Sequence, residues 1–161
     1  MIQQPRKGVC RGAQIGQAAL LCGLPDPGVV IAVAVTYIAD FLLRKQGLTL
    51  TEAASVIAAP FWSTIERRAP EEREQLRYLR TVFPSLLITG PFSIVLGFTG
   101  GLMALNDRLK LRSMVTAEKG DRVYIASEEA AIRAMEPAAE NLYAPAGGEP
   151  VIVKVREGAA I

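Results

Sequence analysis

The sequence predicts an α+β fold, in which helices come first along the chain and antiparallel strands come after them. Three observations predict it. Apolar residues recur at steps of three and four before Pro84, and they form short apolar or alternating stretches after it. The uncharged segment 81–106 is interrupted by six prolines and glycines. Because the strand-like stretches are apolar on both faces, their sheet needs cover on both sides.

The first helix is predicted over residues 29–45. Its period is set by residues at steps of three or four, namely Val30, Val33, Tyr37, Phe41 and Arg44. Arg44 and Lys45 suit the negative end of a helix dipole, and Gly47 suits the position just past a helix end.

A short second helix is predicted over residues 50–58. Thr49 and Glu52 have capping-box spacing, in which the threonine hydroxyl accepts the Glu52 amide and the carboxylate reaches back. Phe61 and Trp62 come next and are expected to be core anchors under a loop. A third helix, 70–82, begins at a proline, and its charged faces indicate a solvated surface.

The strands come after Pro84. They are predicted at residues 86–88, 92–98, 102–105, 122–126 and 151–155. Thr99-Gly100-Gly101 is expected to be a hairpin turn, and residues 145–150 a second turn. Ser127 is expected to cap a short helix that runs through Met135.

Composition limits the possible functions. The chain has 161 residues, half of them hydrophobic, and a net charge of +2. No dense basic run is present, so nucleic-acid binding is not expected. The lack of histidine excludes Ser-His-Asp and Cys-His catalysis and histidine-ligated metals. Cys10 and Cys22 lack zinc-ligand spacing, so no metal or cofactor is expected.

The N-terminal segment 1–33 is expected to be irregular and separate from residues 34–161. Prolines and Asp26 interrupt its apolar residues, so no signal peptide is expected. Segment 81–106 is long enough to span a membrane, but its breakers favour two buried strands and a turn. We expect a cytoplasmic protein without a membrane span; a small membrane-associated protein stays open as an alternative.

Several segments resemble class II glutamine amidotransferase domains of the glutamate synthase kind, in order and spacing. They are the helical Asp40–Leu48, Thr89-Gly90-Pro91-Phe92 before a strand, Asp107–Arg112, Ile125–Ile132, and Gly148-Glu149-Pro150 before the last strand. The resemblance covers roughly residues 34–157, and residues 34–161 are assigned to a partial domain of this family.

The resemblance implies the αββα four-layer sandwich of N-terminal-nucleophile hydrolases, present here only in its C-terminal portion. In that family an N-terminal cysteine thiolate attacks the glutamine side-chain amide, and its own α-amine serves as the base. The ammonia that is released supplies a glutamate synthase-type subunit or domain, which is therefore the partner expected for this chain.

The N-terminal part departs from the family pattern. Cys22-Gly23-Leu24 matches the family's nucleophile motif, but it is internal and lies just ahead of the first helix. Cys10 is followed by Arg11 where the family has glycine. No Asn-Gly pair, the family's oxyanion segment, occurs in the chain. Asp26 is the candidate for the acid that holds the substrate's amino group, if a gap is allowed. No catalytic residue is assigned.

The resemblance leaves two functions open. The first is a truncated or degenerate amidotransferase domain, inactive alone, that docks on a synthase-type partner. The alternative is an active glutaminase whose nucleophile is delivered by processing or by a partner chain. Because the family's other strands are missing, Phe92, Ile94, Leu96 and their neighbours are expected to leave an uncovered apolar face, which favours self-association into a homo-oligomer.

The remaining polar features have structural interpretations. Asp107, Arg108 and Arg112 are either an ion-paired turn near a site or a loop whose charges fix the chain between strands, and we favour the loop. Ser127 and Glu128 are explained by a helix start. The glycine pairs at 100–101 and 147–148 are expected to be turn glycines, because neither has a phosphate-loop context.

Overall fold

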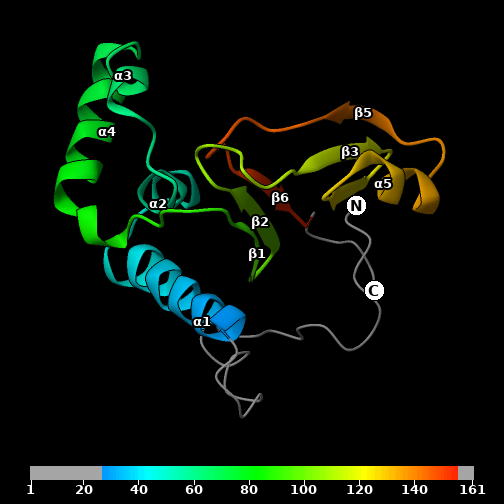
Figure 1. The fold of residues 1–161 in the computed structure, drawn as a ribbon, viewed down its shortest axis with the longest axis horizontal. Coiled ribbons are helices and arrows are strands. Elements are labelled where there is room, and N and C mark those ends of the chain that lie inside the picture. The colour runs from blue at the N-terminus through cyan, green and yellow to red at the C-terminus, as the bar shows by residue number, and fades with distance from the viewer. Residues whose placement is uncertain (1–26, 156–161) are drawn as a thin grey trace.

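The computed structural model describes residues 27–155 (Figure 1). The helices are α1 (Pro27–Asp40), α2 (Leu50–Ile57), α3 (Trp62–Ile65), α4 (Pro70–Val82) and α5 (Glu129–Met135), with a π-helical turn η1 (Phe41–Lys45) and a 3-10 turn η2 (Pro84–Leu86). The strands are β1 (Ser93–Phe98), β2 (Gly101–Asn106), β3 (Val115–Lys119), β4 (Arg122–Ala126), β5 (Glu140–Tyr143) and β6 (Val151–Lys154). The α+β class with antiparallel sheets is confirmed.

The strands form two three-stranded antiparallel sheets, in the orders β1-β2-β6 and β4-β3-β5. The first sheet contains the predicted hairpin, since Phe98 pairs with Gly101 across the two residues Thr99 and Gly100. Gly100 has φ +86°, a backbone conformation that favours glycine. The predicted turn before β6 is also present, and it contains Gly148 at φ +75°.

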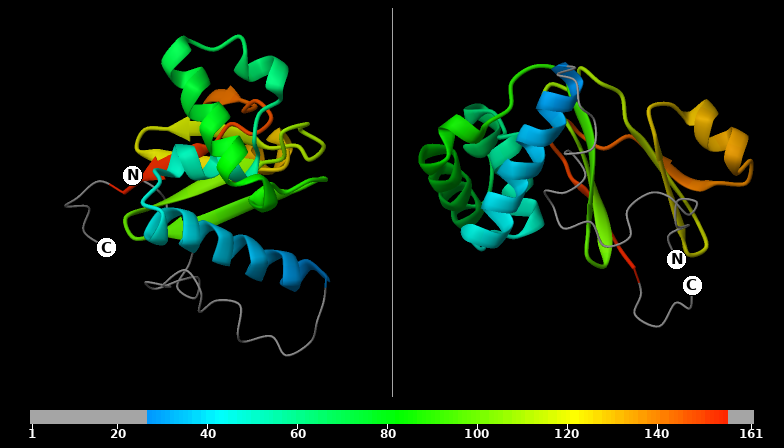
Figure 2. Two further views of the ribbon diagram at one scale, coloured as in Figure 1. Left: turned by 90° about the vertical axis from the view of Figure 1, so that its left-hand side faces the viewer. Right: turned by 90° about the horizontal axis from the view of Figure 1, so that it is seen from below.

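Three apolar clusters show the order of the layers. The largest joins α2, α4 and η1 to one face of the first sheet, where Met103 and Leu105 are fully buried. A second cluster lies between the two sheets and includes Ala104 and Val153 of the first sheet with Val123 of the second. A third joins the outer face of the second sheet to Ile132 of α5. The layers therefore run helices, sheet, sheet, helix (Figure 2, right).

The sequence signals at the first two helices are confirmed. The Glu52 amide donates to the Thr49 hydroxyl at 3.2 Å, and the Thr49 amide donates to the Glu52 carboxylate at 2.7 Å. The same carboxylate accepts from Gln75 Nε2 at 2.5 Å, which ties α4 to the start of α2. Hydrogen bonds from Thr49, first its backbone and then its hydroxyl, lower the pKa of Glu52. Gly47 has φ +69° just past η1, as its position predicted.

Several expectations about individual segments are wrong. Residues 86–88 form no strand; Pro84–Leu86 is a 3-10 turn, and the Ile88 amide donates to the Ile57 carbonyl at 2.9 Å, at the end of α2. Phe61 and Trp62 are not core anchors, because 39% and 48% of their surfaces are exposed. They begin α3 at the surface.

One face of β1, in the first sheet, is uncovered. Phe92 is buried, and Ile94 and Leu96 pack against the helical cluster. The opposite face of β1 is the exposed one, with Val95 61% exposed. The sheet is therefore incompletely covered, as predicted, but through Val95, which lies between Ile94 and Leu96, and not through those two residues or Phe92.

Two expectations about segments of the chain can be compared with the described residues. The division at residue 33 falls inside α1, which is continuous from Pro27 to Asp40. Across residues 27–155, every helix is too short or too polar to cross a membrane. Cys10, Cys22 and Asp26 lie outside the described residues.

Candidate functional site

The loop after β2 is organised around the carboxylate of Asp107, which is only 2% exposed. One carboxylate oxygen, Oδ1, accepts the backbone amides of Leu109 and Leu111, both at 3.0 Å. The other, Oδ2, accepts the amide of Arg112 at 3.2 Å. A single carboxylate thus accepts hydrogen bonds from three backbone amides of an exposed loop, which is not part of a strand.

These contacts also determine the charge of Asp107. Burial by itself raises the pKa of this carboxyl, but hydrogen bonds from the backbone of Leu111, Arg112, Leu109 and Phe92 lower it, and the net shift is downward. Asp107 is therefore ionised at neutral pH, with its oxygens committed to backbone amides. That arrangement suits a structural carboxylate better than a group that must exchange protons with a substrate.

Three of the family-like segments meet at this loop. The Asp107 amide donates to the Phe92 carbonyl at 3.0 Å, which joins the loop to the Thr-Gly-Pro-Phe segment. The turn before β6 packs against the other side: a Cβ at Gly147 would lie 2.5 Å from the Arg108 carbonyl oxygen. A Cβ at Gly148 would lie 2.9 Å from the carbonyl oxygen of Ala58, just past the end of α2. We call this meeting point the Asp107 junction.

The arginines of the loop have separate contacts. Arg108 donates through Nη1 to the Ala59 carbonyl at 3.4 Å, and its guanidinium carbon lies 4.8 Å from the centre of the Phe61 ring. The Arg112 carbonyl accepts from Asn106 Nδ2 at 3.4 Å. Among residues 33–155, neither arginine forms an ion pair with Asp107. The sequence left two interpretations of these residues. The structure agrees with a loop whose charges fix the course of the chain, and not with an ion-paired turn.

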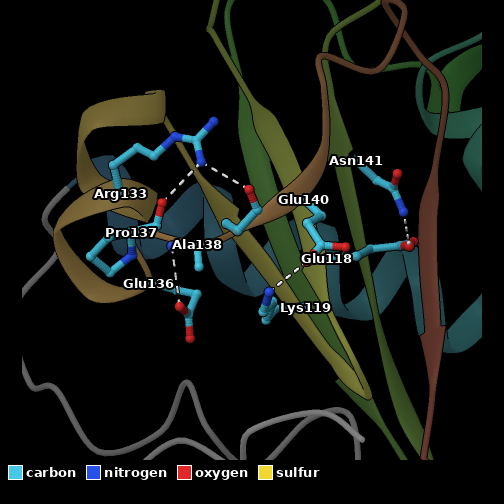
Figure 3. Close-up of polar contacts among 9 residues, drawn as sticks. Glu118, Lys119, Arg133, Glu136, Pro137, Ala138, Glu140 and Asn141 are labelled. Carbon is cyan, nitrogen blue, oxygen red and sulfur yellow. Dashed lines mark hydrogen bonds and ion pairs between the residues drawn. The ribbon is translucent and has the colours of Figure 1, made fainter.

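The Ile125–Ile132 segment lies apart from the Asp107 junction, on the second sheet. The residue at the N-cap of α5 is Glu128, and it makes no side-chain cap bond, so the expectation that Ser127 caps this helix is wrong. Arg133 fastens the far end of α5 instead, donating from Nη1 to the Ala139 carbonyl at 2.8 Å and to the Pro137 carbonyl at 3.2 Å (Figure 3).

The edge strand β5 is held to β3 by polar side chains that the sequence did not single out (Figure 3). Lys119 and Glu140 form an ion pair at 2.5 Å, and Asn141 Nδ2 donates to Glu118 Oε2 at 3.1 Å. The pair raises the pKa of Lys119 and lowers the pKa of Glu140, in each case through their mutual hydrogen bond first. All four side chains lie at the surface of a strand pair, so the pairing of β5 with β3 accounts for their contacts without a catalytic role.

No group of histidine, cysteine or acidic side chains suited to a metal ion occurs in the part of the chain that the structure describes. Whether Asp26 binds substrate stays a prediction, as does any role of Cys22 or Cys10, because all three lie outside that part.

Comparisons with known proteins give one relative. An uncharacterized protein of Archaeoglobus fulgidus is 38% identical over 120 residues, which is 74% of this chain and 32% of the relative. The chain therefore spans about a third of the length of the curated relative it matches. No protein-family model matches the chain, and no solved structure matches it. The fold defines the chain as an α+β protein with two antiparallel sheets between helical layers.

Proposed function

We propose that this chain is a class II glutamine amidotransferase-like domain, truncated or degenerate, whose two sheets are a partial αββα sandwich of the N-terminal-nucleophile type. The observation that carries the proposal is the Asp107 junction. Three segments chosen for their resemblance to the family, 89–92, 107–112 and 148–150, are in contact at the loop that the buried Asp107 carboxylate organises. The helix, sheet, sheet, helix order of the layers also suits such a sandwich.

The chain alone is proposed to be inactive toward glutamine. Amide hydrolysis by this route needs a thiolate to attack, an α-amine to carry its proton, and oriented donors for the tetrahedral oxyanion. Cys22 becomes N-terminal only after removal of the 21 residues before it, and the sequence contains no Asn-Gly segment. Loss of a single oxyanion donor typically costs on the order of 10²–10³ in rate. The role left to the chain is docking on a glutamate synthase-type partner in the cytoplasm.

The first arm of the test measures ammonia released from glutamine by the purified chain, with and without thiol alkylation. We expect no release above the blank. Cys22→Ala is the informative variant and Cys10→Ala its matched control. Release that Cys22→Ala abolishes and Cys10→Ala leaves intact would show the alternative, an active glutaminase. Cys22-Gly23-Leu24 is the feature that favours that alternative.

A second arm is needed because inactivity alone is also the result for an unrelated protein. Binding to a synthase subunit that lacks its own amidotransferase domain is measured by sedimentation, with an unrelated protein of similar size as the control. We expect a saturable complex with the synthase subunit only. Absence of both ammonia release and complex formation would overturn the family assignment.

A further inference from the structure

Two arginines from distant parts of the chain lie beside the end of α2. Arg80, on α4, has its guanidinium carbon 4.3 Å from the centre of the Trp62 ring and donates a hydrogen bond to the Pro60 carbonyl. Arg108 stacks on Phe61 and donates to the neighbouring Ala59 carbonyl. The two guanidiniums are thus held on two successive carbonyls and two successive aromatic rings. We call them the arginine pair.

The arginine pair has no acidic partner among residues 33–155, where Arg44, Arg68, Arg77 and Arg133 each form an ion pair. The pKa of Arg80 is lowered, by burial first and then by the positive charge of Arg108. The two guanidiniums are neighbours, because they bond successive carbonyls, those of Pro60 and Ala59. Each guanidinium carries five N–H donors and uses one in the bonds described.

A purely structural role explains part of this arrangement. Cations just past the C-terminal end of α2 offset its dipole. Arg80 and Arg108 each satisfy one carbonyl that follows the helix, those of Pro60 and Ala59. That role uses a single donor of each guanidinium and leaves the other donors available to a ligand.

A pocket of about 260 Å³ adjoins Arg80, and the residue that bonds Arg108, Ala59, forms part of its wall. Trp62 and Arg80 form part of its wall, and the rest of the wall is apolar: Val56, Ala59, Leu79, Phe83, Pro84 and Leu87. Its volume is close to the lower end for small-molecule sites. A small concave site with one charged wall suits a ligand that has an anionic group and an apolar body.

We propose that the arginine pair and this pocket bind a small organic anion, whose carboxylate or phosphate group lies on Arg80 and Arg108 and whose apolar part lies in the pocket. The planar guanidinium matches both anions through paired N–H bonds. This site goes beyond the proposed function and does not depend on it, since nothing in it hydrolyses glutamine.

Trp62 is the only tryptophan of the chain, so its fluorescence reports directly on the site. The probes are phenyl phosphate, benzoate, inorganic phosphate and the neutral benzyl alcohol, titrated into the full chain at constant ionic strength set with sodium chloride. We expect saturable changes with phenyl phosphate and benzoate. Inorganic phosphate and benzyl alcohol, which each lack one half of the recognised chemistry, should bind at least tenfold more weakly.

Arg108→Gln and Arg80→Gln should each weaken the binding of phenyl phosphate at least tenfold. The matched control is Arg77→Gln, on the same helix as Arg80, because Arg77 is already paired with Glu66 at 2.6 Å. It should change the affinity less than twofold. Circular dichroism checks folding, and Arg80→Lys, which keeps the charge but loses the planar fork, should lie between wild type and Arg80→Gln.

Three outcomes would overturn the proposal. One is the absence of saturation with every probe on the wild-type chain, a result that does not depend on any variant folding. Another is an equal loss of affinity in Arg77→Gln, which would mean a diffuse charge effect. The third is tighter binding of an acidic peptide such as hexaglutamate than of phenyl phosphate, which would assign the surface to a protein partner.

Discussion

Asp107→Asn isolates what the buried carboxylate contributes to the fold. Asparagine keeps one oxygen, which can still accept the amides of Leu109 and Leu111, although a neutral acceptor binds them more weakly. Its amide nitrogen replaces Oδ2 and faces the Arg112 amide, so a donor meets a donor. A hydrogen bond to a charged group contributes about 1.5–3 kcal/mol, and a neutral one about 1 kcal/mol.

Because Leu109, Leu111 and Arg112 are exposed residues, amides that lose the carboxylate can regain water, which puts the cost at the lower end of that range. We expect Asp107→Asn to lower the free energy of unfolding by about 2 kcal/mol and Asp107→Ala by about 3 kcal/mol. Urea unfolding at neutral pH measures both. Glu74→Gln, at an exposed position of α4, is the control and should change the free energy by less than about 0.5 kcal/mol.

The dependence of the free energy of unfolding on pH provides the result that would refute this reasoning. The folded-state pKa of Asp107 is lowered, so the stability that its charge contributes is fully present above its unfolded pKa of about 3.8. That contribution is lost as the pH falls through the lower, folded-state value. The difference between wild type and Asp107→Asn should therefore be constant from about pH 5 to 7 and shrink below about pH 4. A difference that instead grows on acidification would refute the assignment of a charged, amide-bound carboxylate.

The remaining predictions concern close packing and an unpaired hydroxyl. Gly147→Ala should destabilise the fold by about 3 kcal/mol, because its Cβ would lie 2.5 Å from the Arg108 carbonyl oxygen, whereas Gly97→Ala, which meets nothing within 4 Å, should be nearly neutral in the same urea titration. Thr116→Val should raise the free energy of unfolding by about 1 kcal/mol, and with it the thermal midpoint. The reason is that the buried Thr116 hydroxyl has no hydrogen-bond partner in the described part of the chain. Thr81→Val, which removes a hydroxyl bonded to the Arg77 carbonyl at 2.8 Å, should not raise the midpoint; equal midpoints for the two variants would contradict the reasoning.

Much of the helical layer could be predicted from the sequence because its signals are local. The capping box of Thr49 and Glu52 lies within one turn, and the glycine that ends η1 is two residues past the last helical position. The β1–β2 hairpin is likewise encoded by its turn, because Gly100 adopts a conformation that other residues disfavour. In each case the determining contact is between residues fewer than ten positions apart.

In the second sheet, the sequence predicted β4, but the edge strand β5 depended on the tertiary structure. β3 pairs along its length with the neighbouring β4 across a two-residue turn, which is a local contact. β5 is polar, and it becomes a strand because it pairs with β3 over more than twenty positions, through Lys119–Glu140 and Asn141–Glu118. Strand formation of this kind depends on the partner and not on intrinsic preference. Phe61 and Trp62 were misplaced for a related reason: the sequence shows two large aromatic residues, but only the fold brings Arg80 and Arg108 over their rings.

The Asp107 junction shows the same division. Resemblance singled out the segments 89–92, 107–112 and 148–150, and their order was visible in the sequence. Their convergence was not, since it requires β2 to lie between β1 and β6 and the turn of Gly147 to approach Arg108 closely enough to exclude a side chain. Local hydrogen bonds and turn conformations are properties of short segments, so the sequence alone determines them. Contacts between distant segments depend on how every layer packs, so the fold as a whole decides them.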